Sequence, residues 1–409
     1  MDSNQSVDIA MDTLTGAMAA AEPAAEPVKW YKAFWKKRTL LLILIPVSLL
    51  ILWIVRNNPM IAEFVFARGI YKWISQGISF ISAIFPFSLM EVEVIAVPVA
   101  ALFLIFRFFV KILWKLYKRS ADTGYTFTLG IVNAASTLGV VFFLYLMLGG
   151  INYYRYSFAV YSGLEIRESS VEELYDLNLD LADQAAAIRE QLRETKGAED
   201  ENGVLQINNS DWQAVSGNME EAFLKLSEEY PVLGGYYRSL KPVFFSDFMS
   251  RMEITGIFWP FTMEANVNIN AADYSIPATM GHELAHLRGF MREDEANFIG
   301  YLVCKESYKL EYQYSGIMLA LTYAGNQLYR QDPALYQAVR EHYNTEMVAD
   351  LRDEYYYWKQ FEDTAISTVS NSMNDNYLKA NNQSDGVKSY GRMVDLLLAE
   401  YRKNHADSE

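Results

Sequence analysis

The sequence predicts an α+β protein, mostly α, with three N-terminal transmembrane helices followed by a domain that contains a small sheet. Three long apolar runs nearly free of charge lie between about Leu40 and Ile151, and each approaches the length that is needed to cross a bilayer. After Ile151 the composition is that of an ordinary soluble protein, and its apolar residues recur mostly at helical spacing. A chain of 409 residues is long enough for two or three folded units.

The N-terminal part should consist of a tail and a membrane domain. Residues 1–28 are small, acidic and low in complexity, which predicts a disordered cytoplasmic tail. The membrane domain is expected over 29–151, with transmembrane helices at about 40–55, 92–110 and 125–151. The first of these runs is close to the shortest length that spans a hydrocarbon core.

The stretch between the first and second apolar runs has a different character. In "ARGIYKWISQGISFISAIFPF" the residues Arg68, Lys72 and Gln76 interrupt the apolar ones, so the segment is too polar to cross a bilayer. An amphipathic helix that lies along the membrane interface fits this pattern. The lipid bilayer is therefore the first partner that the sequence predicts.

Basic residues predict the orientation of the chain in a cell membrane. Lys and Arg cluster before the first apolar run and after the second, whereas the loop between these runs holds only Arg56, Arg68 and Lys72. By the positive-inside rule, the N-terminus is cytoplasmic. Three spans then put residues 152–409 outside the cytoplasm, as the extracytoplasmic domain of a multi-pass membrane protein.

The charge of this domain excludes nucleic acid as a partner. The chain has a formal net charge of −15, with 13 basic and 9 acidic residues in 1–151 and 22 basic and 41 acidic residues after it. The second part therefore carries −19, which repels phosphate backbones. Since Cys304 is the single cysteine, no intrachain disulfide can form and the core must stabilise the domain.

The extracytoplasmic domain begins with two stretches of helical periodicity. The first, "SSVEELYDLNLDLADQAAAIREQLRET", has Ser170 as its expected N-cap, and "NMEEAFLKLSEEYP" follows after a polar loop. Next, "RMEITGIFWPFTMEANVNINA" is rich in β-branched and aromatic residues, which predicts strands interrupted at Pro260. From about Ser275 to the C-terminus the pattern is helical again.

The most specific pattern is "HELAH", which begins at His282 and contains two of the four histidines. Since His282 and His286 stand at i and i+4 of a predicted helix, they share one face. Two imidazoles at this spacing can bind one Zn²⁺, and Glu283 can act as the general base toward a zinc-activated water. The helix is expected over "IPATMGHELAHLR", with Ser275 as its N-cap and Gly289 at its end.

A catalytic zinc needs a third protein ligand and an open fourth position. The acidic turn after the helix offers Glu293 and Glu295, which differ by two residues, so only one of them can face the zinc. Glu293 is preferred, because Asn297 lies one turn later and can orient a ligand imidazole without touching the metal. The alternative is that these carboxylates only favour the first turn of a second helix through the helix dipole.

Other candidates are weaker. His342 lies in a polar helical stretch and His405 lies near the C-terminus, so both are interpreted as solvated surface histidines. Cys304 lies in an apolar run, where a lone cysteine usually belongs to the core. Among the many tyrosines, Tyr314 is a guess for a donor that stabilises an oxyanion.

Two resemblances support the zinc site. "EDEAN" resembles the E-x-x-A-[DN] element of gluzincin-type metallopeptidases, in which the first glutamate binds zinc. The chain as a whole resembles an uncharacterised bacterial family, a domain of unknown function with three N-terminal spans and a zincin-like domain. That resemblance covers nearly the whole chain from the first span, through "GGINYYR", "GIFWPFTMEANVN", "HELAHLRGFMREDEANF" and "YSGIMLAL". It implies a zincin-like metallopeptidase fold whose edge strand, within Ile254–Ile269, pairs with an extended substrate.

The sequence therefore predicts a membrane-anchored zinc metallopeptidase that hydrolyses peptide bonds in an extracytoplasmic protein or peptide. In this interpretation the metal ligands are His282, His286 and Glu293, Glu283 is catalytic, and Asn297 supports a ligand. The alternative is a non-enzymatic membrane-tethered binding or sensor protein with a structural or vestigial zinc site. A closed site with four protein ligands would favour the alternative.

Overall fold

The computed structural model describes residues 28–195, 197–207, 211–381 and 392–406. The tail predicted at 1–28 lies almost wholly outside the described residues. The chain forms two compact units, with boundaries between Leu44 and Ile45, between Pro98 and Val99, and between Val140 and Val141. Residues 45–98 therefore belong to the same unit as the large C-terminal part of the chain.

Three helical segments are long and apolar enough to cross a membrane: Lys37–Asn57, Leu89–Tyr117 and Thr123–Leu148. The first joins a 3₁₀ helix, η2 (Lys37–Ile43), to α2 (Leu44–Asn57), and the others are α4 (Leu89–Tyr117) and α5 (Thr123–Leu148). The three predicted spans are confirmed as apolar helices, but their limits differ.

The third span ends at Leu148 and not at Ile151 as the sequence suggested. Gly149 and Gly150 follow it, and glycine pairs are weak helix formers. A 3₁₀ helix, η4 (Gly150–Tyr154), then leads away from the span. The second span is longer than predicted, since it begins at Leu89 and continues past Lys111 and Lys115 to Tyr117.

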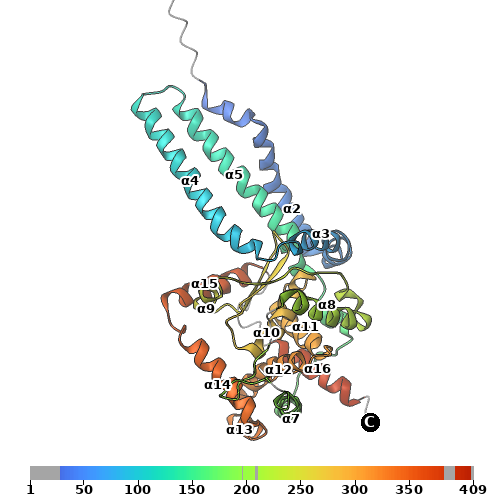
Figure 1. Ribbon diagram of the computed structural model, residues 1–409. Coiled ribbons are helices and arrows are strands. Elements are labelled where there is room, and N and C mark those ends of the chain that lie inside the picture. The colour runs from blue at the N-terminus through green and yellow to red at the C-terminus, as the bar shows by residue number, and fades with distance from the viewer. Residues whose placement is uncertain (1–27, 196, 208–210, 382–391, 407–409) are drawn as a thin grey trace, which may run out of the picture. The chain divides into compact units, whose positions relative to one another are not determined.

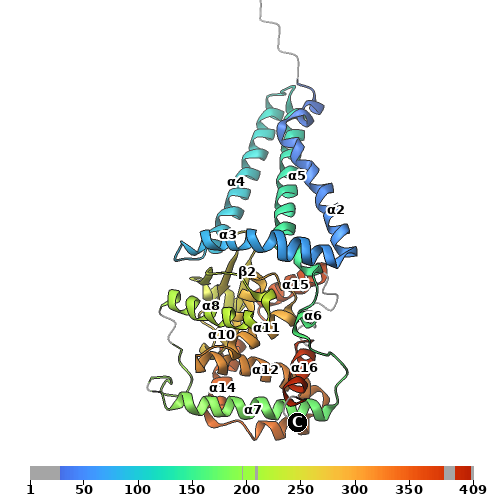
Figure 2. The same cartoon turned by 90° about the vertical axis from the view of Figure 1, so that its right-hand side faces the viewer.

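The segment between α2 and α4 is helical, as predicted. It consists of a π-helix, η3 (Ile61–Tyr71), and α3 (Lys72–Ala83) (Figure 2). Most of its exposed side chains are apolar; the buried residues of α3 are serines, whereas η3 buries the carboxylate of Glu63 among apolar side chains. The exposed side chains are Phe64, Val65, Trp73, Phe80 and Ile81, and the buried ones include Glu63, Ser75, Ser79 and Ser82.

The serines of α3 form hydrogen bonds with other segments of the large unit. Ser75 Oγ lies 3.0 Å from the hydroxyl of Tyr237, and Ser79 Oγ lies 2.8 Å from Ser239 Oγ. Ser82 donates to the backbone oxygen of Thr262 at 2.5 Å. Because the polar face is satisfied by protein, the exposed apolar face has the character of a helix that lies in a lipid interface.

The rest of the large unit is mostly helical (Figure 1). A capping box at Ser170 and Glu173 begins α7, as the sequence predicted for Ser170. The helices that follow η4 are α6 (Phe158–Ser162), α7 (Val171–Arg193), α8 (Trp212–Glu229), α9 (Ser246–Arg251), α10 (Ile276–Leu287), α11 (Glu293–Lys305), α12 (Leu310–Gln331), α13 (Pro333–Arg340), α14 (Thr345–Lys359), α15 (Ala365–Ala380) and α16 (Met393–Ala406).

A three-stranded sheet lies before α10 in the chain. Its strands β1 (Leu240–Pro242), β2 (Gly256–Trp259) and β3 (Glu264–Val267) have the order β1-β3-β2. β3 pairs parallel with β1 and antiparallel with β2. Pro260 separates β2 from β3, which confirms the predicted interruption.

The register of β2 leaves one edge of the sheet open among the described residues. The amide of Asn268 donates to the carbonyl of Thr255, and Ile257 stands opposite Asn266. Alternate residues of a strand direct their backbone groups to the same side. Thr255 and Ile257 therefore face β3, whereas the backbone groups of Gly256 and Phe258 face away from β3, where the N–H of Phe258 hydrogen-bonds the Glu283 carboxyl group.

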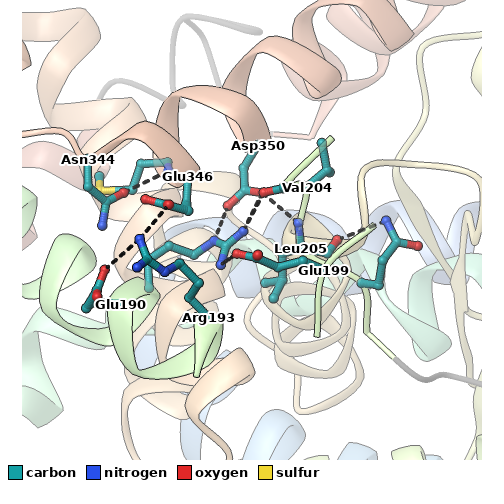
Figure 3. A network of polar contacts seen from close by, with 12 residues as sticks. Glu190, Arg193, Glu199, Val204, Leu205, Asn344, Glu346 and Asp350 are labelled. Carbon is teal, nitrogen blue, oxygen red and sulfur yellow. Dashed lines mark hydrogen bonds and ion pairs between the residues drawn. The ribbon is translucent and has the colours of Figure 1, made fainter. Parts of the chain in front are cut away.

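A buried ion pair joins α7 to α14. The guanidinium of Arg189 donates from Nε to Asp350 Oδ2 at 2.8 Å, and the hydroxyl of Tyr314 donates to the same oxygen at 2.8 Å. The amide of Leu205 donates to Asp350 Oδ1, which fixes the loop after α7 (Figure 3). Tyr314 is therefore part of the domain's polar core, where its hydroxyl is already occupied.

Candidate metal centre

Helices α10 and α11 pack against each other at two glycines. A Cβ atom on Gly281 would lie 2.7 Å from Val303 Cγ1 and 3.0 Å from the Cα atom of Gly300. A Cβ atom on Gly300 would lie 3.1 Å from the backbone nitrogen of His282. Since any larger side chain would push the helices apart, the two glycines permit the close approach that brings Glu293 to the histidine face of α10.

The sequence predicted the C-terminal end of α10 correctly but not its N-cap. Gly289 has a φ of +87° directly after the helix, which is a conformation that suits glycine and ends the helix as predicted. Ser275 does not cap it, because its hydroxyl donates to the carbonyl of Ala272 and not to an amide of the helix. That expectation was wrong because a 3₁₀ turn, η6 (Asp273–Ser275), runs directly into α10.

Three side chains converge between these helices. His282 Nε2 lies 3.2 Å from Glu293 Oε2, and His286 Nε2 lies 3.7 Å from Glu293 Oε1. One ligand atom from each residue lies within 4.8 Å of the other two. Tetrahedral ligands at bond lengths of 2.0 to 2.2 Å are separated by roughly 3.4 Å, so the spacing of these donors fits a single ion of that size. Two imidazoles and a carboxylate are also a donor set that suits zinc.

The other ring nitrogens of the histidines have acceptors of their own. His282 Nδ1 lies 2.8 Å from Asn297 Oδ1, and His286 Nδ1 lies 2.8 Å from the carbonyl oxygen of Phe290. Asn297 donates its Nδ2 to the hydroxyl of Tyr323 at 3.1 Å, which orients the amide. When the histidines are neutral, these acceptors hold the proton on Nδ1 and direct the Nε2 lone pairs toward Glu293.

Burial and charge give the two histidines different proton affinities. Burial lowers the pKa of His282, but the hydrogen bond and the charge of Glu293 outweigh burial and raise this pKa to about 9. Burial and the charge of His282 lower the pKa of His286 to about 4. At neutral pH and without a metal, His282 therefore carries a proton beside the Glu293 carboxylate. A metal ion must displace that proton in order to bind.

Glu283 lies against strand β2. It is buried, and its Oε2 atom has no hydrogen-bond partner among the residues that the structure describes. A Cβ atom on Gly256 would lie 2.5 Å from Glu283 Oε1, so only glycine leaves room for this carboxylate at the strand. Burial raises the pKa of Glu283 to about 8, although the positive charge of His282 opposes the shift.

The two glutamates of the acidic turn, Glu293 and Glu295, have different partners. Glu293 faces the histidines, whereas Glu295 accepts a hydrogen bond at 2.8 Å from the amide of Phe158 and pairs with Arg292. Both carboxylates lie in the first turn of α11, so the helix dipole also favours them. The geometry agrees with the preference for Glu293, and its role as a metal ligand stays a prediction.

The remaining candidates lie elsewhere. Cys304 is fully buried in the core, as expected, and the Nδ1 atoms of His342 and His405 contact Asp183 and the carbonyl of Tyr401. Tyr314 donates its hydroxyl to Asp350, so the structure gives no support to the guess that this hydroxyl stabilises an oxyanion. Gly256 and Tyr323 could not be recognised from the sequence, because a long-range contact leaves no periodic signal in it.

The glycine contact gives a testable prediction. We expect Gly281→Ala to separate α10 from α11, to lower the free energy of unfolding by about 1–3 kcal/mol, and to weaken zinc binding because Glu293 moves away from the histidines. Chemical denaturation and zinc titration of the full chain measure the two effects. Gly217→Ala in α8 is the control, since its Cβ atom would meet nothing within 4 Å. Unchanged zinc affinity in Gly281→Ala would contradict the proposed role of this contact.

Comparison with known proteins assigns the chain to a family. A family model described as "Protein of unknown function (DUF3810)" matches residues 66–398, a range that includes α3, the sheet and both helices of the candidate metal centre. A search of the curated proteins and a search of the solved structures each returned no match. The predicted membership of an uncharacterised family with membrane helices is confirmed, and the zincin-like character of the domain stays a prediction. The chain belongs to the DUF3810 family of proteins of unknown function.

Proposed function

We propose that this protein is a membrane-anchored zinc metallopeptidase of zincin-like type. The observation that carries the proposal is the convergence of His282, His286 and Glu293 on one point beside the buried carboxylate of Glu283. A metal site needs the three donors, but it does not need a fourth, acidic group at its side with an oxygen that has no partner among the described residues. Such a group is the expected feature of a site that moves protons.

Each residue has a distinct part in the proposed hydrolysis. His282, His286 and Glu293 would hold the zinc ion. The bound ion would act as a Lewis acid that activates water and polarises the peptide carbonyl. Glu283 would take a proton from the water whose oxygen attacks the carbonyl carbon. It would deliver this proton to the nitrogen of the leaving amine when the C–N bond breaks. Asn297 would keep His282 in the orientation and tautomer that bind metal.

The free edge of β2 supports an extended peptide as the substrate. The backbone groups of Gly256 and the carbonyl of Phe258 face that edge, while Gly256 lies against Glu283 and the N–H of Phe258 hydrogen-bonds the same carboxyl group. A peptide added to the edge would be held by main-chain hydrogen bonds, with its scissile bond beside the carboxylate. An extracytoplasmic protein or peptide is therefore the substrate class that we propose.

The alternative is a tethered binding or sensor protein with a structural zinc. Structural zinc sites are closed by four protein ligands. Within the residues that the structure describes, the group of side chains that could hold one ion has three members. An open fourth position supports the peptidase over the alternative.

The proposed localisation is a cell membrane, with a cytoplasmic N-terminus and an extracytoplasmic site. We expect Asn202→Cys, in an exposed loop after α7, to react with a membrane-impermeant maleimide in intact cells. Ser3→Cys should react only after permeabilisation. The wild-type chain is the control, because its single cysteine, Cys304, is buried. The reverse pattern of labelling would overturn this orientation.

The role of Glu283 can be separated from metal binding. We expect Glu283→Gln to keep zinc and its melting temperature, but to lose about 10²–10⁴-fold in peptide cleavage, because an amide cannot accept the water's proton. Mass spectrometry of a peptide library incubated with the full chain in detergent would detect new termini, and metal analysis would give the zinc content. Equal cleavage by both proteins, or none by the wild type, would contradict the mechanism.

Glu293 and Glu295 form a matched pair for the third ligand. We expect Glu293→Ala to lower zinc affinity by more than the 10 to 100-fold typical of groups that only support a ligand. Glu295→Ala should leave zinc affinity nearly unchanged, yet lower the free energy of unfolding by about 1–3 kcal/mol, because the buried amide of Phe158 loses its acceptor. Zinc titration combined with denaturation distinguishes the two. If Glu295→Ala empties the site, the assignment of Glu293 is wrong.

A further inference from the structure

A small polar cavity lies where η3 and α3 meet other segments of the large unit. Its volume is about 140 Å³, and four of the residues that line it are cations: Arg68, Lys72, Arg155 and Arg288. The segment that includes Pro231 and Gly234 forms the opposite wall. All of these residues belong to one compact unit. The lining therefore favours an anion over any apolar ligand.

Two of the four cations are already neutralised by buried carboxylates. Arg155 donates to both oxygens of Glu63, at 2.9 and 3.0 Å, and Arg288 donates to Glu220 at 2.8 Å. These ion pairs form the floor of the cavity, because both guanidiniums are almost completely buried. They fix the geometry of the cavity without leaving a net charge.

The other two cations have no such partner. Arg68 is exposed and Lys72 is half-buried, neither forms an ion pair with a carboxylate in the described part of the chain, and the guanidinium of Arg68 lies 5.5 Å from the ring centre of Phe64. An ion pair of this kind is the usual way to satisfy a cation beside a buried site. The cavity therefore carries two positive charges that an anionic ligand could neutralise.

The position of the cavity identifies the source of the anion. Arg68 and Lys72 belong to the helical segment that begins shortly after α2, the first candidate span, ends at Asn57. The neighbouring exposed side chains on that segment are Phe64, Val65, Trp73 and Ile74, all apolar. Apolar side chains of this kind suit the acyl region of a bilayer, and basic side chains beside them suit its phosphates.

We propose that this cavity binds the phosphate of an anionic glycerophospholipid headgroup. Arg68 and Lys72 bind the phosphate oxygens, and the apolar face around Phe64 and Trp73 contacts the acyl chains. The planar guanidinium of Arg68 can engage two oxygens, whereas Lys72 acts as a point charge. This site is separate from the candidate metal centre and does not depend on peptidase activity.

The cavity adjoins the end of the histidine helix. Arg155 Nη1 donates to the carbonyl of Arg288 at 3.2 Å, and the hydroxyl of Tyr71 donates to the carbonyl of Leu287 at 3.2 Å. These carbonyls belong to the last residue of α10 and to its C-cap, where helices leave acceptors without intrahelical partners. A lipid bound to Arg68 and Lys72 would thus lie near Arg155 and Tyr71, whose side chains bind the carbonyls at the end of α10.

Native mass spectrometry of the full chain can test the lipid. The protein is released from mixed micelles with equal amounts of phosphatidylglycerol and phosphatidylcholine, and the lipid that stays bound is identified. We expect selective retention of phosphatidylglycerol. Arg68→Gln and Lys72→Gln should each lower its apparent affinity roughly fivefold, and the double variant roughly 25-fold. Arg56→Gln, an exposed cation at the end of α2 but outside the cavity, is the matched control and should have no effect.

Two further experiments distinguish lipid binding in the cavity from binding elsewhere and from binding of free phosphate. Val232→Trp fills the cavity from the opposite wall without a change of charge, and it should also abolish selective retention. Inorganic phosphate, titrated into the lipid-free protein in detergent, should bind more weakly than the lipid. Phosphate binding with no retention of phosphatidylglycerol would overturn the lipid as the source. Retention that survives both the double variant and Val232→Trp would overturn the cavity as the site.

Discussion

The close packing of α10 on α11 is the contact on which the candidate site depends. A helix can place two histidines on one face through its own periodicity, but no third ligand for the same ion is available on that face. The third donor comes from α11, and the backbones of the two helices can approach closely because Gly281 and Gly300 carry no side chains. Glu293 then reaches both imidazoles from the first turn of its helix.

The membrane-proximal segment and the site belong to one compact unit. The buried pair of Glu63 and Arg155 joins η3 to the end of α10, and Tyr71 adds a hydrogen bond to the same turn. A buried ion pair is costly to break, because removal of either partner leaves an uncompensated charge. The position of α10 is thus linked to η3, so these two helices are constrained together.

Three buried or partly buried glutamates near the candidate site have different surroundings. Glu293 pairs with histidines, Glu295 holds a backbone amide and an arginine, and Glu283 keeps an oxygen without a partner among the described residues. The first two are satisfied by their surroundings, as buried charges usually are. Glu283 is the exception: the backbone of Phe258 hydrogen-bonds its carboxyl group, but Oε2 has no partner among the described residues.

The sequence by itself determined the local features of this protein. Apolar runs predicted three membrane-crossing helices, Pro260 separated two strands, and the i, i+4 spacing put His282 and His286 on one face. Each of these features depends on residues close together in the chain, so periodicity and composition are sufficient. The end of the third span was misjudged, because an apolar composition continues past Gly149 although the helix does not.

Tertiary structure decided the features that join distant residues. From the sequence alone, Glu293 could only be preferred over Glu295. The choice depends on how α11 packs against α10. That packing depends on Gly281 and Gly300, which are nineteen positions apart in the chain. Tyr314 was a guess, and its partner Asp350 lies on another helix. The cationic cavity draws on four separate segments, none of which shows a pattern alone. Contacts of this kind arise from packing, which acts between surfaces and leaves no period in the sequence.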